Sequence, residues 1–148
     1  MDKYFIGVMT GTSADALDGC LVSFDKGFKL INTESIDLFW DRKGTYKETY
    51  EKCIKAGYKD MSDHPDMLRL DNAILKTTNT LVDNLILDTN IEKKDVHAIG
   101  FSGQTTHHTY KESYQLGNPM VLANSSNIRV IADFRQFDIK NGGMGAPL

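Results

Sequence analysis

The sequence predicts an α/β fold built on a mixed sheet. Three apolar, strand-like runs in the first forty residues are joined by short turns, which is typical of an antiparallel meander. The apolar spacing then changes to steps of three and four residues, which indicates helices. Two further short apolar runs follow these helices, and they favour additional strands that enter the same sheet.

The predicted meander has three strands. Residues 3–9 are apolar with little alternation, which indicates a buried strand. Residues 17–25 and 28–40 are predicted to form the next two strands, with Lys26-Gly27 as the turn between them. The aromatic pair Phe39-Trp40 ends the third strand and is interpreted as part of the core.

Two helices are predicted after the meander. The first spans residues 45–56, begins with a threonine that can cap it and is ended by Gly57. The second spans residues 62–87, with Ser62 as its cap and an amphipathic pattern of apolar residues. Pro65 is tolerated in its first turn because the amide of that position would be unpaired in any case.

The rest of the chain predicts buried strands that end in polar residues. A strand over 96–101 ends in the turn 102–106, and a strand over 128–132 ends in the polar segment 133–138. Polar residues beyond strand ends line a common crevice in sheets of this kind. We therefore expect these two segments to converge with the turn 10–15 on one site. Between the two strands lie a predicted brief strand and a short helix, at residues 114–116 and 118–125.

The turn Thr10-Gly-Thr-Ser-Ala-Asp15 suits a phosphate group. Gly11 allows backbone angles closed to other residues and a close approach by a ligand. The amides of residues 11–13 and two hydroxyls can point at anionic oxygens, which indicates phosphoryl transfer. Asp15 or Asp18 could hold a divalent cation through oxygen or water. The alternatives are a purely structural turn, since these residue types are favoured in turns, and a solvated strand position for Asp18. No Gly-Lys-Ser/Thr follows, so the turn is not a Walker loop.

Composition limits the class of protein. Hydrophobic residues make up 41% and charged residues 25%, which is typical of a globular domain. The net charge of −3, without a basic block, argues against a nucleic-acid partner. No apolar run is long enough to cross a bilayer, and the N-terminus lacks the form of a signal peptide. Cys20 and Cys53 have no metal-ligand spacing, so we expect reduced thiols in a cytoplasmic protein.

Five motifs occur in order along the whole chain, and together they resemble the anhydro-N-acetylmuramic acid kinase family. The motifs are Gly7-Val-Met-Thr-Gly-Thr-Ser13, Gly100-Phe-Ser-Gly-Gln-Thr105, Gln115-Leu-Gly-Asn118, Ala132-Asp-Phe-Arg135 with Asp138, and Gly142-Gly-Met-Gly-Ala-Pro-Leu148. This family belongs to the superfamily of sugar kinases, actin and Hsp70-type ATPases. The resemblance implies two ribonuclease-H-like domains around an interdomain cleft.

The resemblance also implies an activity and a domain plan. The family hydrolyses the 1,6-anhydro ring of anhydro-N-acetylmuramic acid and phosphorylates O6 with ATP and Mg²⁺, in peptidoglycan recycling in the bacterial cytoplasm. It is generally a homodimer. Members are roughly twice this length, as two domains require. We therefore expect residues 1–148 to be a single N-terminal lobe with the phosphate loop and part of the sugar site, inactive alone. The second lobe, with the general base, would be absent.

The resemblance also implies binding roles for individual residues of this chain. Ala16 stands where the family often has glycine, so its methyl group is expected to stiffen the loop. Arg135 would bind the lactyl carboxylate, although it could instead pair with Asp138 on the surface. Asp15 and Asp18 would lie near Mg²⁺, through water. The implied nucleotide-binding residues are Gly11, Thr12, Ser13, Ala14, Asp15, Ala16, Leu17 and Asp18. The implied sugar-binding residues are Gln104, Thr105, Asp133 and Arg135.

Two other classes of function stay open at this point. A metal-dependent nuclease of the ribonuclease-H type also gathers carboxylates at strand ends, and the Gly-Thr-Ser turn and the lack of basic surface speak against it. A non-catalytic ribonuclease-H-like remnant or interaction module would expose an apolar face and self-associate. The nuclease candidates are Asp15, Asp18, Asp133 and Asp138.

Overall fold

The computed structural model describes residues 3–38 and 45–146. The strands are β1 (Tyr4–Thr10), β2 (Ala16–Ser23), β3 (Lys29–Asp37), β4 (Val96–Phe101), β5 (Gln104–His108), β6 (Ser113–Leu116) and β7 (Val130–Ile131). The helices are α1 (Tyr46–Lys55), α2 (Pro65–Ile86), α3 (Pro119–Ser126) and α4 (Phe134–Lys140), with a 3₁₀ turn η1 (Lys93–Asp95).

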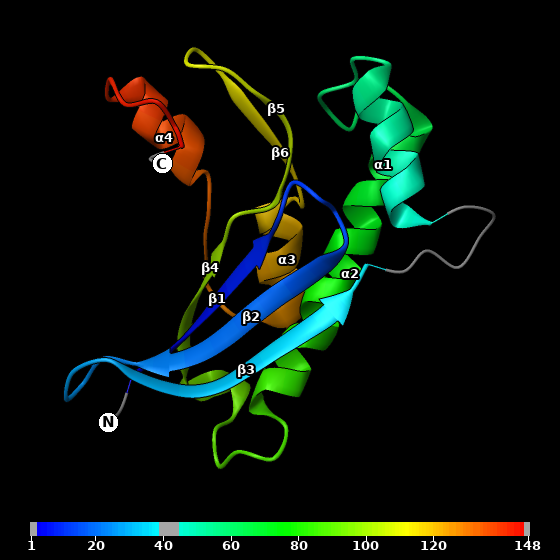
Figure 1. The fold of residues 1–148 in the computed structure, drawn as a ribbon. Coiled ribbons are helices and arrows are strands. Elements are labelled where there is room, and N and C mark those ends of the chain that lie inside the picture. The colour runs from blue at the N-terminus through cyan, green and yellow to red at the C-terminus, as the bar shows by residue number, and fades with distance from the viewer. Residues whose placement is uncertain (1–2, 39–44, 147–148) are drawn as a thin grey trace.

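The main sheet has five strands in the order β3-β2-β1-β4-β7 (Figure 1). The first three strands pair antiparallel, whereas β4 and β7 run parallel to β1. This arrangement confirms the predicted mixed α/β sheet, a meander followed by helix-linked strands. The strands β5 and β6 form a separate hairpin above the sheet, beside α4 (Figure 1).

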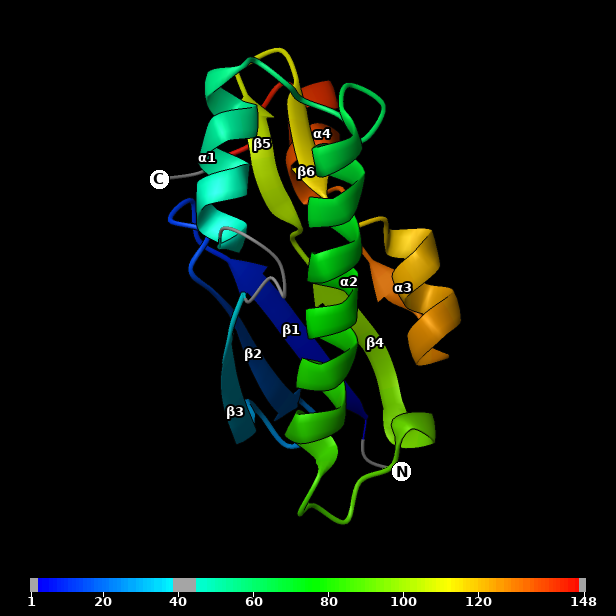
Figure 2. The ribbon, with the colours of Figure 1, turned by 90° about the vertical axis from the view of Figure 1, so that its right-hand side faces the viewer.

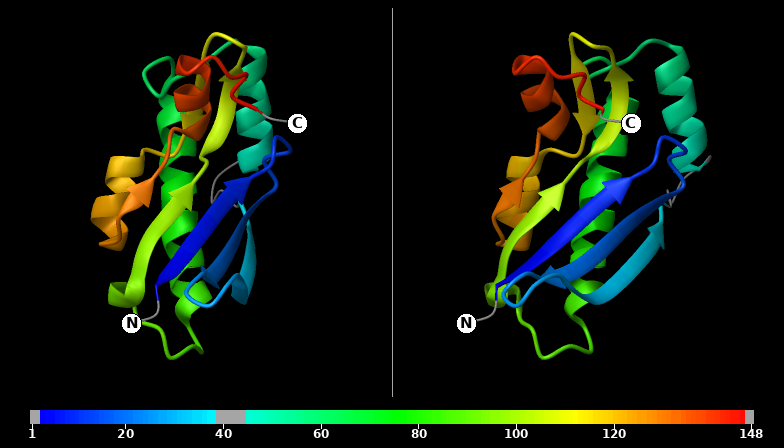
Figure 3. Two further views of the ribbon diagram at one scale, coloured as in Figure 1. Left: turned by 90° about the vertical axis from the view of Figure 1, so that its left-hand side faces the viewer. Right: turned by 60° about the vertical axis from the view of Figure 1, so that its left-hand side comes forward.

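The core lies between the sheet and α2, which crosses one face of it with α3 alongside (Figure 2). Gly19 on β2 permits this close packing, because a Cβ atom there would overlap the side chain of Leu81 on α2. No helix among the described residues covers the opposite face of β1, β2 and β3 (Figure 3). The buried core includes Ile6, Leu17, Leu21, Ile74, Leu81, Leu85, Ile99 and Phe101.

The structure confirms both predicted ends of helix α1, the Thr45 cap and the stop at Gly57. The amide of Glu48 donates to Thr45 Oγ1, and the amide of Thr45 donates to Glu48 Oε2, both at 3.2 Å. This reciprocal pair is a capping box. Gly57 follows the helix with φ of +82°, the left-handed conformation that ends helices.

The predicted cap of α2 was wrong. Its N-cap is His64, whose Nδ1 accepts from the amide of Asp66 at 3.1 Å. Because Pro65 occupies the first helical position, the cap must be the residue directly before it. Ser62 lies in the preceding turn, where its amide donates to Asp60.

Other element boundaries also differ from the prediction. The predicted turn 102–106 extends only to Gly103, since β5 begins at Gln104. The strand predicted over 128–132 is reduced to β7, and the polar segment 133–138 that follows it contains the start of α4, a helix that was not predicted. The predicted strand end Phe39-Trp40 lies outside the described residues.

Candidate functional site

The turn between β1 and β2 is closed by a hydrogen bond from the amide of Ala14 to the carbonyl of Gly11, at 3.2 Å. The residue with a left-handed backbone is Ala14, with φ of +52°, and its side chain is buried. Gly11 does not use its conformational freedom here, and a Cβ atom at that position would meet only Ser13 Oγ, at 3.4 Å. The closed turn holds the exposed residues Thr12 and Ser13 at its tip.

The amides at this tip are available to a ligand. Those of Thr12 and Ser13 have no hydrogen-bond partner within the part of the chain that the structure describes. Adjacent free amides attract anionic oxygens. Lys47 on α1 places a cation beside them, with its Nζ 2.8 Å from Asp15 Oδ1. The hydrogen bond from Lys47 lowers the pKa of Asp15, so this carboxyl is ionised at neutral pH.

Gln104 at the start of β5 holds the turn in place. Its Oε1 accepts from Thr10 Oγ1 at 2.8 Å, and its Nε2 donates to the carbonyl of Gly11 at 3.1 Å. The side chain is fully buried, so both ends of its amide are used inside the protein. The turn 10–15 and the segment after β4 thus meet, as the sequence predicts. This geometry makes Gln104 a positioning residue, and its direct contact with a sugar stays a prediction.

The remaining loop residues lie in β2. Ala16 and Leu17 are its first two residues, and Leu17 is buried in the core. Asp18 faces away from α2, where its Oδ1 accepts from Ser35 Oγ at 2.8 Å. The role of Asp15 and Asp18 in binding Mg²⁺ stays a prediction. As hard oxygen ligands they suit that ion, but both already have side-chain partners.

The carboxylates do not gather as a nuclease would require. Among residues 3–38 and 45–146, no group of three or more His, Cys, Asp or Glu side chains could hold a metal ion. The described residues therefore do not support the nuclease alternative, whose candidates are Asp15, Asp18, Asp133 and Asp138. Asp15 is instead paired with Lys47, Asp18 accepts from Ser35, and Asp138 accepts from the amide of Gly145.

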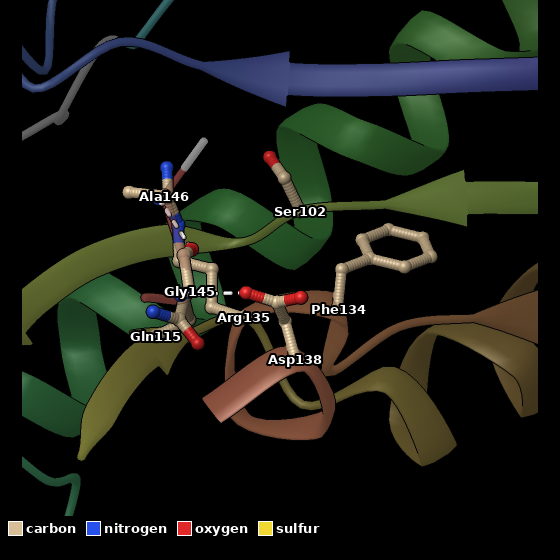
Figure 4. A pocket seen from close by; sticks show the side chains of 7 residues that line it. All are labelled: Ser102, Gln115, Phe134, Arg135, Asp138, Gly145 and Ala146. Carbon is tan, nitrogen blue, oxygen red and sulfur yellow. Dashed lines mark hydrogen bonds between the residues drawn. The ribbon is translucent and has the colours of Figure 1, made fainter. Parts of the chain in front are cut away.

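A pocket of about 460 Å³ lies between the end of β4, β6 and α4 (Figure 4). Arg135 Nη1 donates to the carbonyl of Gly145 at 3.1 Å, and Asp138 Oδ2 accepts from the amide of Gly145 at 2.8 Å. Both side chains therefore hold the backbone that follows α4, instead of forming the surface pair considered above. The pocket is lined by Ser102, Gln115, Phe134, Arg135, Asp138, Gly145 and Ala146.

Gly145 permits this closure. Its φ is +71°, and a Cβ atom there would lie 2.8 Å from Ile139 and 3.0 Å from the carbonyl of Arg135. A side chain would thus be strained by both the backbone angle and the contacts. The glycine-rich segment after α4 packs against that helix and forms one wall of the pocket.

A second hollow, of about 300 Å³, adjoins the first and shares Ser102 and Gln115 with it. Asp133 lines this hollow together with Asp71 of α2. Asp71 is only 2% exposed and accepts from the amide of Gly117 at 2.6 Å. Burial raises the pKa of Asp71.

Thr105, the remaining predicted sugar ligand, lines neither hollow. Its carbonyl accepts from the hydroxyl of Tyr50 at 2.5 Å, and its Oγ1 accepts from Gln115 Nε2 at 3.4 Å. Sequence reasoning missed Lys47, Asp71, Ser102 and Gln115 as site residues. The last two belong to recognisable motifs, but nothing local marks the first two.

The fold and the site define an α/β protein with two hollows beyond the end of β4 and a β1–β2 turn that is tied to β5 through Gln104. A family model described as anhydro-N-acetylmuramic acid kinase matches residues 3–148. The chain therefore belongs to the anhydro-N-acetylmuramic acid kinase family. This finding confirms the resemblance that the sequence motifs indicate.

Curated relatives agree with the family model. The chain is 37% identical over 154 residues to a protein named anhydro-N-acetylmuramic acid kinase from Shewanella oneidensis, covering 98% of this chain and 39% of that protein. A protein of the same name from Pseudomonas syringae pv. tomato is 33% identical, with 100% and 39% covered. The chain thus spans about two-fifths of the length of the curated relatives it matches.

The fold is also similar to that of a solved structure. It is a reductive activator for a corrinoid, iron-sulfur protein, with a TM-score of 0.55 and 18% identity, covering 87% of this chain and 22% of that one. At this identity the likeness concerns the fold alone. In the described residues, no helix has the length and apolar character needed to span a bilayer.

Proposed function

We propose that residues 1–148 form the lobe of an ATP-dependent anhydro-N-acetylmuramic acid kinase that holds the γ-phosphoryl group and part of the sugar. The whole reaction would hydrolyse the 1,6-anhydro ring and phosphorylate O6, in peptidoglycan recycling in the bacterial cytoplasm. Support comes from the family membership and above all from the free amides of Thr12 and Ser13 in a turn fixed by Gln104.

The lobe itself is proposed to be ribonuclease-H-like, as in actin-type ATPases. The supporting observation is the strand order β3-β2-β1-β4-β7, in which three antiparallel strands are followed by two parallel ones. Curated relatives are longer than this chain, and we further propose that catalysis needs residues from the part that the chain does not match, including the general base. Residues 1–148 alone would then show little or no turnover. The homodimer stays a prediction of the family resemblance.

In phosphoryl transfer a protein mainly positions the reacting groups and stabilises the charge of the transferred phosphoryl group. The amides of Thr12 and Ser13 would bind the γ-phosphoryl oxygens, and Lys47 adds positive charge within reach of the same turn. Gln104 keeps the turn from relaxing, because it holds both Thr10 and Gly11. Mg²⁺, bound with the nucleotide, would neutralise phosphate charge near Asp15 and Asp18. Arg135 would bind the lactyl carboxylate with the N–H groups that Gly145 leaves free.

Titration of the ¹⁵N-labelled protein with ATP and Mg²⁺ tests this proposal. We expect the amide resonances of Thr12 and Ser13 to shift with bound nucleotide. Thr12→Pro removes one amide donor but suits the second position of a β-turn. A charge-assisted hydrogen bond contributes about 1.5–3 kcal/mol, so affinity should fall roughly tenfold or more.

The matched control is Thr12→Ala, which keeps the amide and should bind ATP more tightly than the proline variant. Absence of ATP-dependent shifts at the turn would contradict the proposal. It would favour the non-catalytic interaction module instead, an alternative supported by the exposed rings of Phe24 and Phe28.

A further inference from the structure

The pair Asn141-Gly142 at the end of α4 is a sequence that promotes a spontaneous reaction of asparagine. It is the only place in the chain where glycine follows asparagine. Glycine has no side chain to shield its backbone nitrogen, so this nitrogen can reach the side-chain amide of the residue before it. Both residues are exposed, and a Cβ atom at Gly142 would meet nothing within 4 Å. Water and hydroxide therefore have access to this peptide bond.

The reaction replaces the side-chain amide of Asn141 with a carboxylate. The backbone nitrogen of Gly142 loses its proton to hydroxide and bonds to Cγ of Asn141. The Cγ–Nδ2 bond breaks, and Nδ2 leaves as ammonia after taking a proton from water. Water then opens the resulting succinimide ring at either carbonyl, which gives aspartate or, with the main chain rerouted through Cγ, isoaspartate. The net change consumes one water molecule and releases one ammonia molecule.

In the folded protein, hydrogen bonds within α4 hold both reacting groups. Nδ2 of Asn141 donates to the carbonyl of Phe137 at 2.8 Å, which ties the side chain to the helix. The amide of Gly142 donates to the carbonyl of Ile139 at 3.0 Å, which opposes the loss of its proton. Because both acceptors belong to α4, the two reacting groups are released together when the end of this helix opens.

Helix α4 is weakly anchored. It has seven residues, none of which is buried, and Phe137 is 71% exposed. The contacts that tie the helix to the rest of the protein include a hydrogen bond from the amide of Ser113 to Gln136 Oε1, at 3.0 Å, and two bonds between its side chains and Gly145. Short helices with few buried contacts open at a small cost in free energy.

We infer that Asn141 is a site of spontaneous deamidation whose rate is set by the opening of α4, and that this modification loosens the wall of the adjoining pocket. The reagents are water and hydroxide, so no enzyme is needed. The inference is independent of the proposed function, because it depends only on the chemistry of the Asn-Gly pair and on the contacts of α4.

The product disturbs the segment that follows α4. A carboxylate at position 141 cannot donate to the carbonyl of Phe137, and its charge is unfavourable at the C-terminal end of a helix. Isoaspartate also adds one main-chain atom directly before Gly143. The backbone there lies so close to α4 that even a Cβ atom at Gly143 would overlap the carboxylate of Asp138. Both products therefore weaken the hold of α4 on Gly145.

Mass spectrometry after incubation at mildly alkaline pH tests the site. Trypsin cuts after Lys140, so residues 141–148 are released as one peptide with a single asparagine. Synthetic aspartyl and isoaspartyl peptides identify the two products. We expect Asn141 to react about fivefold or more faster than the exposed Asn90, because the branched Ile91 shields the nitrogen that follows Asn90. Guanidinium chloride, which unfolds α4, should accelerate the reaction at Asn141 about fivefold or more.

A variant pair tests the control by α4. Gln136→Ala removes the acceptor for the amide of Ser113, so it should accelerate deamidation of Asn141 about threefold or more in the folded protein, but not in denaturant. The control is Thr80→Ala, at an exposed position on α2, which should leave the rate unchanged.

The modified protein tests the effect on the pocket wall. Deamidation adds one negative charge, so anion exchange separates the modified from the unmodified chain. The amide of Gly145 donates to Asp138 Oδ2, and in the modified protein its proton should exchange with solvent about threefold or more faster.

Four results would overturn the inference. They are equal rates at Asn141 and Asn90, a rate at Asn141 that is the same with and without denaturant, equal effects of Gln136→Ala and Thr80→Ala, and unchanged exchange of the Gly145 amide in the deamidated protein.

Discussion

At the scale of single residues, the site depends on polar side chains that hold distant backbone. Gln104 bonds to Gly11, 93 residues away along the chain, and Asp71 bonds to Gly117, 46 residues away. Each bond is buried or partly buried, where an unpaired partner costs more than the bond itself contributes. These side chains therefore set the shape of the turn and of the second hollow before any ligand binds.

The protein should therefore tolerate an amide in place of the Asp71 carboxylate, but not the loss of this polar side chain. Asp71→Asn keeps an oxygen that can accept from Gly117, whereas Asp71→Ala leaves that amide unpaired at a cost of about 1–3 kcal/mol of unfolding free energy. Urea denaturation at neutral pH measures both. Equal stability of the alanine variant and the wild type would show that this bond is unimportant.

Asp71 should also make stability depend on pH. Its pKa is raised in the folded protein, so the native state holds the proton more tightly than the unfolded state does. Its contribution to stability is full below the ordinary carboxyl pKa and is lost as pH rises through the folded pKa. Asp71→Asn should lack this decline when urea midpoints are compared from acidic to neutral pH.

The contact between Gln104 and Thr10 should be measurable by a double-mutant cycle. Gln104→Leu and Thr10→Val each remove one side of the bond between their side chains. Because the two residues touch, we expect a coupling energy of about 0.5–3 kcal/mol in unfolding free energy. Strictly additive effects would mean that this bond does not hold the turn.

At the scale of elements, α1 carries two residues to the site from outside the sheet. Lys47 in its first turn reaches Asp15, and Tyr50 one turn later donates its hydroxyl to the carbonyl of Thr105. The helix begins at a capping box, which satisfies amides that the helix itself cannot. The orientation of this helix therefore matters for both the turn and β5.

Loss of the cap should weaken α1. Thr45→Ala removes the acceptor for the amide of Glu48, so we expect the unfolding free energy to fall by about 1 kcal/mol. Thr80→Ala is the control, because Thr80 lies within α2 and bonds only the carbonyl of Lys76 in its own helix. A loss at Thr80 as large as that at Thr45 would contradict this role of the cap.

At the scale of the whole molecule, α2 covers one face of β1, β2 and β3, and no helix among the described residues covers the other (Figure 3). A row of rings runs from the turn between β2 and β3 to β4, with neighbouring centroids 5.8, 5.7 and 5.5 Å apart from Phe28 through Phe24 and Phe5 to His97. Phe24 is 57% exposed and Phe28 70% exposed. Contiguous apolar surface of this kind marks a site of association.

We expect residues 1–148 to self-associate through this row of rings, as the sequence predicts for an exposed apolar surface. Sedimentation equilibrium should show a mass that increases with protein concentration. Phe24→Ser combined with Phe28→Ser should weaken the association, whereas Tyr110→Ser, at an exposed site beyond β5, should not. A wild-type protein that stays monomeric at all concentrations would refute this expectation.

The sequence by itself determined the features that depend on neighbours along the chain. Apolar runs specify the strands, threonine and glycine specify the ends of α1, and the Thr10–Asp15 turn follows from its own residue types. Its local motifs also sufficed to identify the family. Helix α4 escaped this reasoning because its seven residues are too few to give a clear helical pattern. Arg135 and Asp138 on this helix also bind Gly145, a contact that no local pattern shows.

Only the tertiary structure decided which of these features meet. Gln104 reaches Gly11 because β4 pairs beside β1, and Asp71 reaches Gly117 because α2 packs against the end of β6. Lys47 reaches Asp15 because α1 returns over the turn. Such contacts depend on strand order and on close packing between distant segments, and no pattern within a short stretch of sequence contains that information.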